Sequence, residues 1–224
     1  MTKTAKKILI GSIIGILVFA LLAAGIFIAV FTQKTPDFSP SELNDNDMFF
    51  GAKFTQNILF QALRTKKKDD LKVIRITNEE MQSAVKLAEN GESLLYLITG
   101  IKPERTDAAN NLYKIKYDNG VYYFTVKLAD SFFSRCFTAN GVAILKYDEG
   151  KLDIDFISLK LGKFELSSKY KEKAEKYILH SLNSEPFYEI FRSSVKKIEH
   201  FKNGNVKIYY YPYRLRKHIG RLAL

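Results

Sequence analysis

The sequence is poor in cysteine, and this scarcity removes one source of stability. Cys136 is the only cysteine among 224 residues, so the chain cannot form an intramolecular disulfide. Packing must therefore stabilise the fold. Cys136 lies between Arg135 and Phe137, and we interpret it as a small buried hydrophobic side chain; a reactive thiol is the alternative.

Recognisable catalytic and ligand-binding motifs are also missing. The sequence contains no nucleophile elbow, P-loop or dinucleotide-binding fingerprint. His180, His200 and His218 are far apart and lack the spacing of metal ligands. We therefore predict no catalytic residue, no metal site and no cofactor, and we expect the protein not to be an enzyme.

Low-complexity tracts are absent and prolines number only five, whereas 46% of the residues are apolar and 13% are aromatic. This composition supplies enough apolar surface to offset the entropy of ordering the chain. We therefore expect an ordered domain with a substantial core.

An apolar run without charge covers residues 8–31, and Lys3, Lys6 and Lys7 precede it. As a helix the run would be about 36 Å long, enough to cross a hydrocarbon core of about 30 Å. The lysines place the N-terminus in the cytoplasm by the positive-inside tendency. We therefore expect a single-pass protein of the cell membrane, integral to the lipid bilayer, with its C-terminal domain outside.

This orientation divides the chain into four parts. They are a cytoplasmic tip, a transmembrane helix, a tether and one extracytoplasmic domain, which cover residues 1–7, 8–31, 32–38 and 39–224. A cleaved signal peptide is the alternative, because it shares the basic start and the apolar run. The length of the run, and its apolar continuation past Ala23, Ala24 and Gly25, favour an uncleaved anchor.

Positive charge exceeds negative charge in the predicted outer domain. The chain carries 35 basic and 24 acidic residues, a formal net charge of +11, and only three of the basic residues precede the apolar run. Such a domain is attracted to anionic lipid headgroups or to an acidic polymer. The predicted compartment and the scatter of the basic residues argue against nucleic acid as a partner. We interpret the clusters at residues 66–68 and 214–217 as solvated turns and ends.

Capping residues and apolar spacing predict two helices near the start of the outer domain. Ser39, Pro40 and Glu42 form a helix start, followed by apolar residues at helical spacing to about Arg64. After an expected strand over residues 71–76, Thr77 and Glu80 form a second capping box, and this helix should end near Glu89. Residues 93–101 leave helix and strand both open, and residues 102–111 are typical of an exposed loop.

Three hairpins are predicted in the rest of the chain. Their strand pairs are residues 112–117 with 121–128, 142–147 with 152–161, and 195–201 with 206–211. A helix is expected over residues 167–183. The pattern indicates an α+β fold, in which an N-terminal transmembrane helix precedes one domain with a curved antiparallel sheet packed on or around helices.

The apolar pattern of one predicted strand slips by one residue. Leu152, Ile154 and Phe156 share a face, but the series resumes on the other face at Ile157 and Leu159. A β-bulge at Phe156 would cause this slip. The bend could leave an apolar groove between helix and sheet, so Phe156 is a candidate contact for an apolar ligand.

Tyrosines and basic residues gather around Pro212. The simpler interpretation is a strand with tyrosines on both faces that ends at an edge proline. The alternative is an interfacial or ligand-facing patch. Its candidate contacts with an apolar ligand or partner are Tyr209, Tyr211 and Tyr213. Its candidate contacts with lipid headgroups are Arg214, Arg216 and Lys217.

Two segments resemble a known family. ITNEEMQ at residues 76–82 resembles the phrase L-T-x-E-E-L-N of small bacterial envelope proteins with one N-terminal membrane helix, and GKLDI at residues 150–154 with SLKLGKFEL at 158–166 resembles a later phrase. Both, in this order, are similar to the YpmS-type proteins. Met81 and Gln82 replace the usual leucine and asparagine, and Ser167 replaces a common proline. The resemblance implies a non-enzymatic domain with a helix wrapped by a curved sheet, in the manner of tubular lipid-binding modules.

We therefore favour a membrane-anchored extracytoplasmic binding module for lipid or another apolar envelope molecule, without catalysis. The alternative is an interaction or scaffold protein of a bacterial envelope assembly. A hydrolase is disfavoured, because no catalytic constellation can be assembled from the sequence.

Overall fold

The computed structural model describes residues 22, 26, 29–90, 113–130, 135–183 and 186–219. The predicted transmembrane segment lies almost wholly outside these residues, as does the segment from 93 to 111. Within the described part, no helix is long and apolar enough to span a bilayer.

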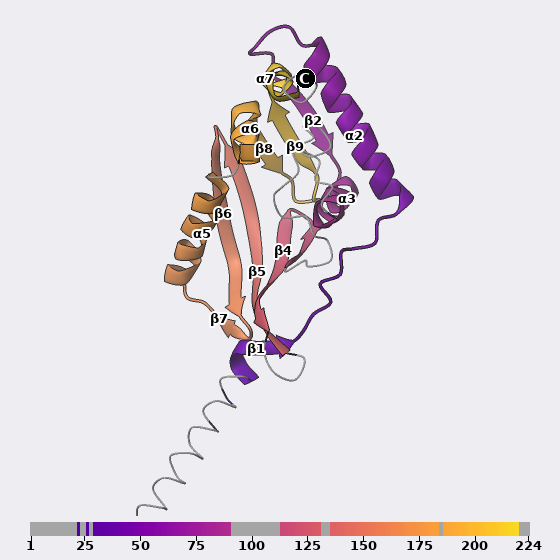
Figure 1. Ribbon diagram of the computed structural model, residues 1–224. Coiled ribbons are helices and arrows are strands. Elements are labelled where there is room, and N and C mark those ends of the chain that lie inside the picture. The colour runs from indigo at the N-terminus through magenta and orange to yellow at the C-terminus, as the bar shows by residue number, and fades with distance from the viewer. Residues whose placement is uncertain are drawn as a thin grey trace, which may run out of the picture.

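The chain contains both helices and strands, and the strands pair antiparallel, which confirms an α+β fold (Figure 1). The elements are β1 (Thr32–Lys34), α2 (Asp45–Arg64), β2 (Lys72–Ile76), α3 (Asn78–Glu89), β3 (Tyr113–Asp118), β4 (Val121–Asp130), β5 (Arg135–Asp148), β6 (Lys151–Leu161), β7 (Phe164–Glu165), α5 (Ser168–Asn183), α6 (Pro186–Ser194), β8 (Val195–His200), β9 (Val206–Tyr210) and α7 (Pro212–Ile219).

The strands form one antiparallel sheet that branches at β5, its longest strand. Along one edge β5 pairs first with β4 and then, at Tyr147 and Asp148, with β8. Its other edge carries β1 and β6. The β4 branch continues to β3, whereas the β8 branch continues through β9 to β2, whose Ile74 pairs with Ile208.

The three predicted hairpins are confirmed as β3–β4, β5–β6 and β8–β9. The predicted β-bulge is also present. Val142 pairs with Ser158 and Ala143 pairs with Phe156, so Ile157 has no opposite residue in β5. Ile157 is 55% exposed while Phe156 and Leu159 are buried, because the bulge keeps both of them on the same face.

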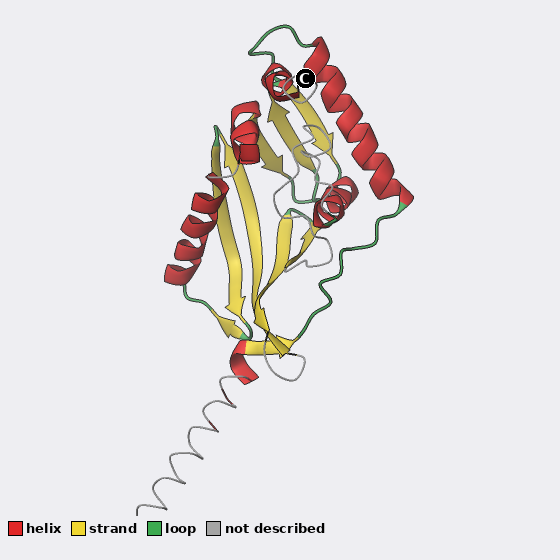
Figure 2. Ribbon diagram, in the orientation of Figure 1, coloured by secondary structure: helices red, strands yellow, loops and turns green. Residues whose placement is uncertain are grey.

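Helices cover one face of the sheet (Figure 2). α5 contributes partly buried residues to a cluster with the β6 residues Ile154, Phe156 and Leu159. α2, α3 and α7 pack on the β8–β9–β2 branch, and their buried residues include Phe50, Ile58, Leu87 and Leu215. The two clusters lie on the same face of the sheet. Ala143 and Tyr147 project from one side of β5. Tyr147 is paired with Ile198, Ile198 with Ile208 and Ile208 with Ile74, so these residues of the second branch project from that side too. We call the opposite side of the sheet the outer face.

The predicted start of the first helix after the tether is wrong. α2 begins at Asp45, and Asn44 is its N-cap, in a capping box with Asp47. Ser39 instead donates its backbone N–H to Asp37 Oδ1. The side chain of Asn44 accepts from the N–H of Asp47, so the helix starts five residues later than Ser39, Pro40 and Glu42 predict.

The predicted strand end at Pro212 is also wrong. β9 ends at Tyr210, and Pro212 is the first residue of α7, a position where its fixed φ and missing N–H suit a helix. Tyr213, Arg214 and Arg216 therefore lie on a helix. α6 was not predicted.

The segment expected as a tether begins with a strand. Thr32 pairs with Phe137 of β5, and Arg135 donates from Nε to Thr32 Oγ1 over 2.7 Å. The N–H of Lys163 donates to the carbonyl oxygen of Val30 over 2.9 Å. A Cβ on Gly162 would lie 2.5 Å from the carbonyl carbon of Phe31, so the two backbones are in close contact. The chain is thus fixed to the sheet from Val30 onward, and we call these contacts the joint.

Candidate functional site

The outer face of β3 to β6 carries two rows of side chains that cross the four strands. The register defines one row as Lys116, Tyr123, Val142 and Ser158. It defines the other row as Lys114, Thr125, Asn140 and Lys160. A groove of about 350 Å³ opens over these eight residues. Three lysines line it and no carboxylate does.

Thr125, Asn140 and Ser158 of the groove form hydrogen bonds with one another or with residues beside the groove. Thr125 Oγ1 donates to Asn140 Oδ1 over 3.0 Å, and Asn140 Nδ2 donates to Thr138 Oγ1 over 3.1 Å. Ser158 Oγ donates to Glu165 Oε2 over 2.8 Å. Lys171 lies 2.8 Å from the same carboxylate, and its hydrogen bond lowers the pKa of Glu165 to about 2. These groups are therefore already satisfied.

Lys116, Lys160 and Tyr123 remain for a ligand. In the described part of the chain, neither Lys116 nor Lys160 has an ion-pair partner, and both are exposed. Tyr123 is 42% exposed, and it lies on β4, between the strands that carry Lys116 and Lys160. The free hydrogen-bonding capacity of the groove is therefore cationic, next to an aromatic ring.

The end of β1 and the segment that follows it form one wall of the groove. Gln33 Nε2 donates to Asn140 Oδ1 over 3.4 Å, and Pro36 lines the groove. At the β3 edge, Lys114 Nζ donates to the carbonyl oxygen of Ser39 over 3.1 Å. Hydrogen bonds from Ser39, with Lys114 nearby, lower the pKa of Asp37. Residues 33–39 are thus bound to both β5 and β3.

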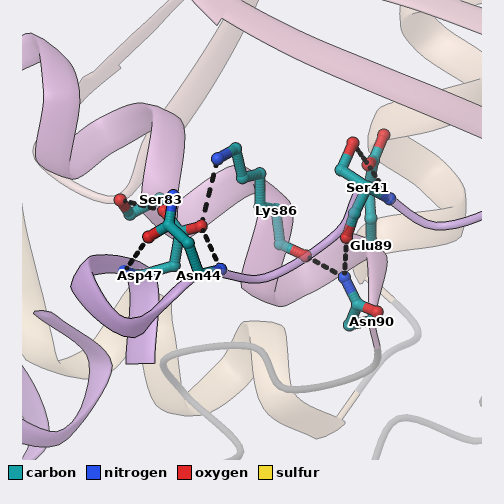
Figure 3. Close-up of polar contacts among 7 residues, drawn as sticks. All are labelled: Ser41, Asn44, Asp47, Ser83, Lys86, Glu89 and Asn90. Carbon is teal, nitrogen blue, oxygen red and sulfur yellow. Dashed lines mark hydrogen bonds and ion pairs between the residues drawn. The ribbon is translucent and has the colours of Figure 1, made fainter. Parts of the chain in front are cut away.

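A carboxylate on α3 holds the end of this wall (Figure 3). Glu89 is 3% exposed; its Oε2 accepts from Ser41 Oγ over 2.7 Å, and its Oε1 accepts from the N–H of Ile115 over 2.7 Å. Asn90 Nδ2 donates to the carbonyl oxygen of Ser41 over 2.9 Å. Glu89 therefore connects the wall to β3, the edge strand of the groove.

A second carboxylate holds α2 on α3. Asp47 is 3% exposed and accepts from Ser83 Oγ over 2.6 Å, from Lys86 Nζ over 3.0 Å and from the N–H of Asn44. Burial alone would raise the pKa of Asp47, but these hydrogen bonds outweigh it and the pKa is lowered. Ser83 and Lys86 are both engaged with this carboxylate, so the arrangement is structural (Figure 3).

The structure separates the candidate residues that the sequence suggested. Phe156 is buried on the helix-covered face, with its ring 5.9 Å from that of Phe124. Tyr209 lies on β9 and donates its hydroxyl to Glu199 over 2.9 Å. Tyr211 and Tyr213 are partly buried around the start of α7. None of the four lines the groove described above.

The candidate headgroup contacts lie on α7. Arg214 stacks over the Tyr211 ring at 4.0 Å, donates to the carbonyl oxygen of Ser193 over 3.1 Å and lies 3.7 Å from Asp69. Arg216 is exposed, and the side chain of Lys217 lies outside the described part. Arg214 therefore joins two segments, 66–70 and 212–219, that are far apart in the sequence.

Sequence reasoning missed Lys114, Lys116 and Lys160. The signal in β3 was the alternation that places Lys114 and Lys116 on one face of the strand, whereas β6 carries no such alternation of lysines around Lys160. The two hairpins were predicted separately, and only the pairing of β4 with β5 brings their lysines to one groove.

Comparison with known proteins yielded no matching family model, curated protein or solved structure. Among the residues that the structure describes, no group of three or more His, Cys, Asp or Glu side chains is arranged to hold a metal ion.

Proposed function

We propose that this protein is a membrane-anchored, non-catalytic binding module that holds a phosphate-bearing envelope molecule in the groove on its outer face. The observation that carries this proposal is a groove lined by three lysines and no carboxylate. Lysine is a common ligand of phosphate groups, and unpaired ammonium groups in a groove favour an anionic ligand. The predicted anchor at residues 8–31 would keep the groove close to the membrane.

The size of the groove favours a headgroup as the bound part. Ligand pockets typically measure about 300–1,000 Å³, and this groove, at about 350 Å³, is near the lower limit. The space between helices and sheet is occupied by the two core clusters. We therefore propose that acyl chains, where the ligand has them, stay outside the protein.

Calorimetry of the full-length protein in neutral detergent micelles tests the proposal. The probes are dihexanoyl phosphatidylglycerol, its zwitterionic phosphatidylcholine counterpart and glycerol 3-phosphate. We expect the anionic probes to bind more tightly than phosphatidylcholine. We expect K116Q/K160Q to weaken binding at least tenfold, since one charge-assisted hydrogen bond contributes about 1.5–3 kcal/mol and about 1.4 kcal/mol is tenfold.

K169Q/K176Q is the matched control, because both lysines are exposed on α5 and the change in net charge is the same. Equal affinity for glycerol 3-phosphate and the lipid would show that the phosphate is recognised without the acyl chains, as the size of the groove predicts. Absence of binding by any anionic probe, or equal losses in both double variants, would reject the groove as the site.

A second candidate function, an interaction or scaffold protein, is favoured by apolar side chains exposed on α2. Met48 is 48% and Phe49 is 69% exposed, although α2 is well packed on its other side. Crosslinking in living cells is the test: a species of defined mass that F49S loses would support a protein partner. An unchanged crosslinking pattern in F49S would reject this surface.

A further inference from the structure

We propose that the end of the domain farthest from β1 is a docking surface for an anionic lipid bilayer. This end, the distal pole, comprises residues 60–72: the last turns of α2, the loop after it and the first residue of β2. In Figure 1 it lies at the top, opposite β1 and the helical residues 29–31. The groove proposed above is not part of it, so the docking surface does not depend on the groove; only the assignment to a second bilayer rests on the membrane anchor of the proposed function.

The distal pole keeps positive charge after its own ion pairs are formed. Lys72 pairs with Asp70 at 3.1 Å, and Asp69 faces Arg214 of α7 at 3.7 Å. The remaining cations, which have no ion-pair partner among the described residues, are Arg64, Lys66, Lys67 and Lys68. Three of them line a hollow of about 530 Å³, so an anionic partner would meet several unpaired cations together.

Apolar side chains stand beside these cations. Phe60 is 50% exposed and Leu63 is 61% exposed, and their spacing of three residues puts them on neighbouring positions of α2. The guanidinium of Arg64 lies 3.7 Å from the centre of the Phe60 ring. A polyanion in solution would use only the cations. Phenylalanine and leucine among lysines and arginine are typical of surfaces that enter the headgroup region of a bilayer.

The position of the distal pole determines which bilayer it can meet. The joint fixes the chain to the sheet from Val30 onward, at the opposite end of the domain. An anchor at residues 8–31 would therefore direct the distal pole away from its own bilayer. We infer that the docking surface contacts a second anionic bilayer.

Vesicle flotation of the full chain tests this inference. The protein would be assembled into phosphatidylcholine nanodiscs, which occupy the apolar N-terminal segment, and mixed with vesicles of equal parts phosphatidylcholine and phosphatidylglycerol. We expect co-flotation with these vesicles and none with pure phosphatidylcholine vesicles. R64Q/K66Q/K67Q should lower partitioning roughly fivefold for each charge removed. F60S/L63S should lower it as well.

Two controls keep the outcome clear. K169Q/K173Q/K176Q removes the same charge from α5 and should float like the wild type. Circular dichroism confirms that each variant is folded. Normal flotation of F60S/L63S together with competition by polyphosphate would identify a polyanion instead and overturn the inference. Equal losses in the α5 variant, or no flotation with anionic vesicles, would overturn it too.

Discussion

Asp47 combines burial with three hydrogen-bond donors, and this combination makes the stability of the fold sensitive to its replacement. Asp47→Asn removes the charge that faces Lys86 while keeping the size of the side chain. We expect a loss of about 2–3 kcal/mol in the free energy of unfolding, below the usual value for a buried pair because Lys86 is one-third exposed. Urea denaturation of both proteins measures the difference.

Asp45→Asn is the matched control, because Asp45 is exposed in the same first turn of α2. It should change stability by less than about 0.5 kcal/mol.

The pH dependence of the stabilisation by Asp47 has a defined sign. The folded-state pKa of Asp47 is lowered, so its stabilisation is complete above the unfolded-state pKa of about 3.9 and is lost as pH falls. Asp47→Asn should flatten stability against pH in that acidic range; an unchanged profile would contradict this role.

At the scale of elements, the bulge in β6 gives two adjacent residues opposite roles. Phe156 is buried against Phe124, whereas Ile157 is unpaired and more than half exposed. We expect Phe156→Ala to lower the free energy of unfolding by about 3–5 kcal/mol and Ile157→Ala by less than about 0.5 kcal/mol. Thermal denaturation measures both. Equal effects would show that the bulge is displaced in solution.

Local signals predicted most of the described elements. The turn residues 118–120 and 148–150 predicted two hairpins, and Thr77 with Glu80 predicted the start of α3, because these interactions form within a few residues. The start of α2 was missed because two caps compete in one segment. Ser41, two residues after the predicted cap, is held by Glu89 from 48 residues away, and the helix starts at the later cap, Asn44. No local pattern contains that contact.

The candidate groove was harder to predict than the elements that build it. The lysines of β3 and β6 come to one groove only in the assembled sheet, where β4 and β5 lie between them, and Pro36 lines that groove because β1 is paired with β5. The tyrosines near Pro212 were more conspicuous in sequence. Tyr210, however, is 2% exposed and donates its hydroxyl to Gln61 on α2, so at least this tyrosine serves the core.

At the scale of the whole molecule, the joint should set how firmly the N-terminal segment is held. Gly162→Ala places a methyl group against the backbone of Phe31 at a residue with φ of +56°. Hydrogen exchange in residues 30–34 should become faster while the core of the domain stays protected. Mass spectrometry of exchanged peptides detects this change.

Gly150→Ala provides the comparison for the joint. Gly150 also has positive φ, +81°, but its nearest contact is the Arg192 side chain at 3.5 Å. We expect it to destabilise the fold by about 1–2 kcal/mol without altering exchange in residues 30–34. Identical exchange in both variants would contradict a fixed joint.

The pairing of β2 with β9 also determines when the domain can be completed during synthesis. Ile74 is made early, but its partner Ile208 follows roughly 130 residues later, which takes about 7–26 seconds at about 5–20 residues per second. During that interval α2 and α3 have no β8–β9 surface to cover, and β2 has both edges open. The order in which the chain is made therefore exposes it to wrong strand pairing until its last strand appears.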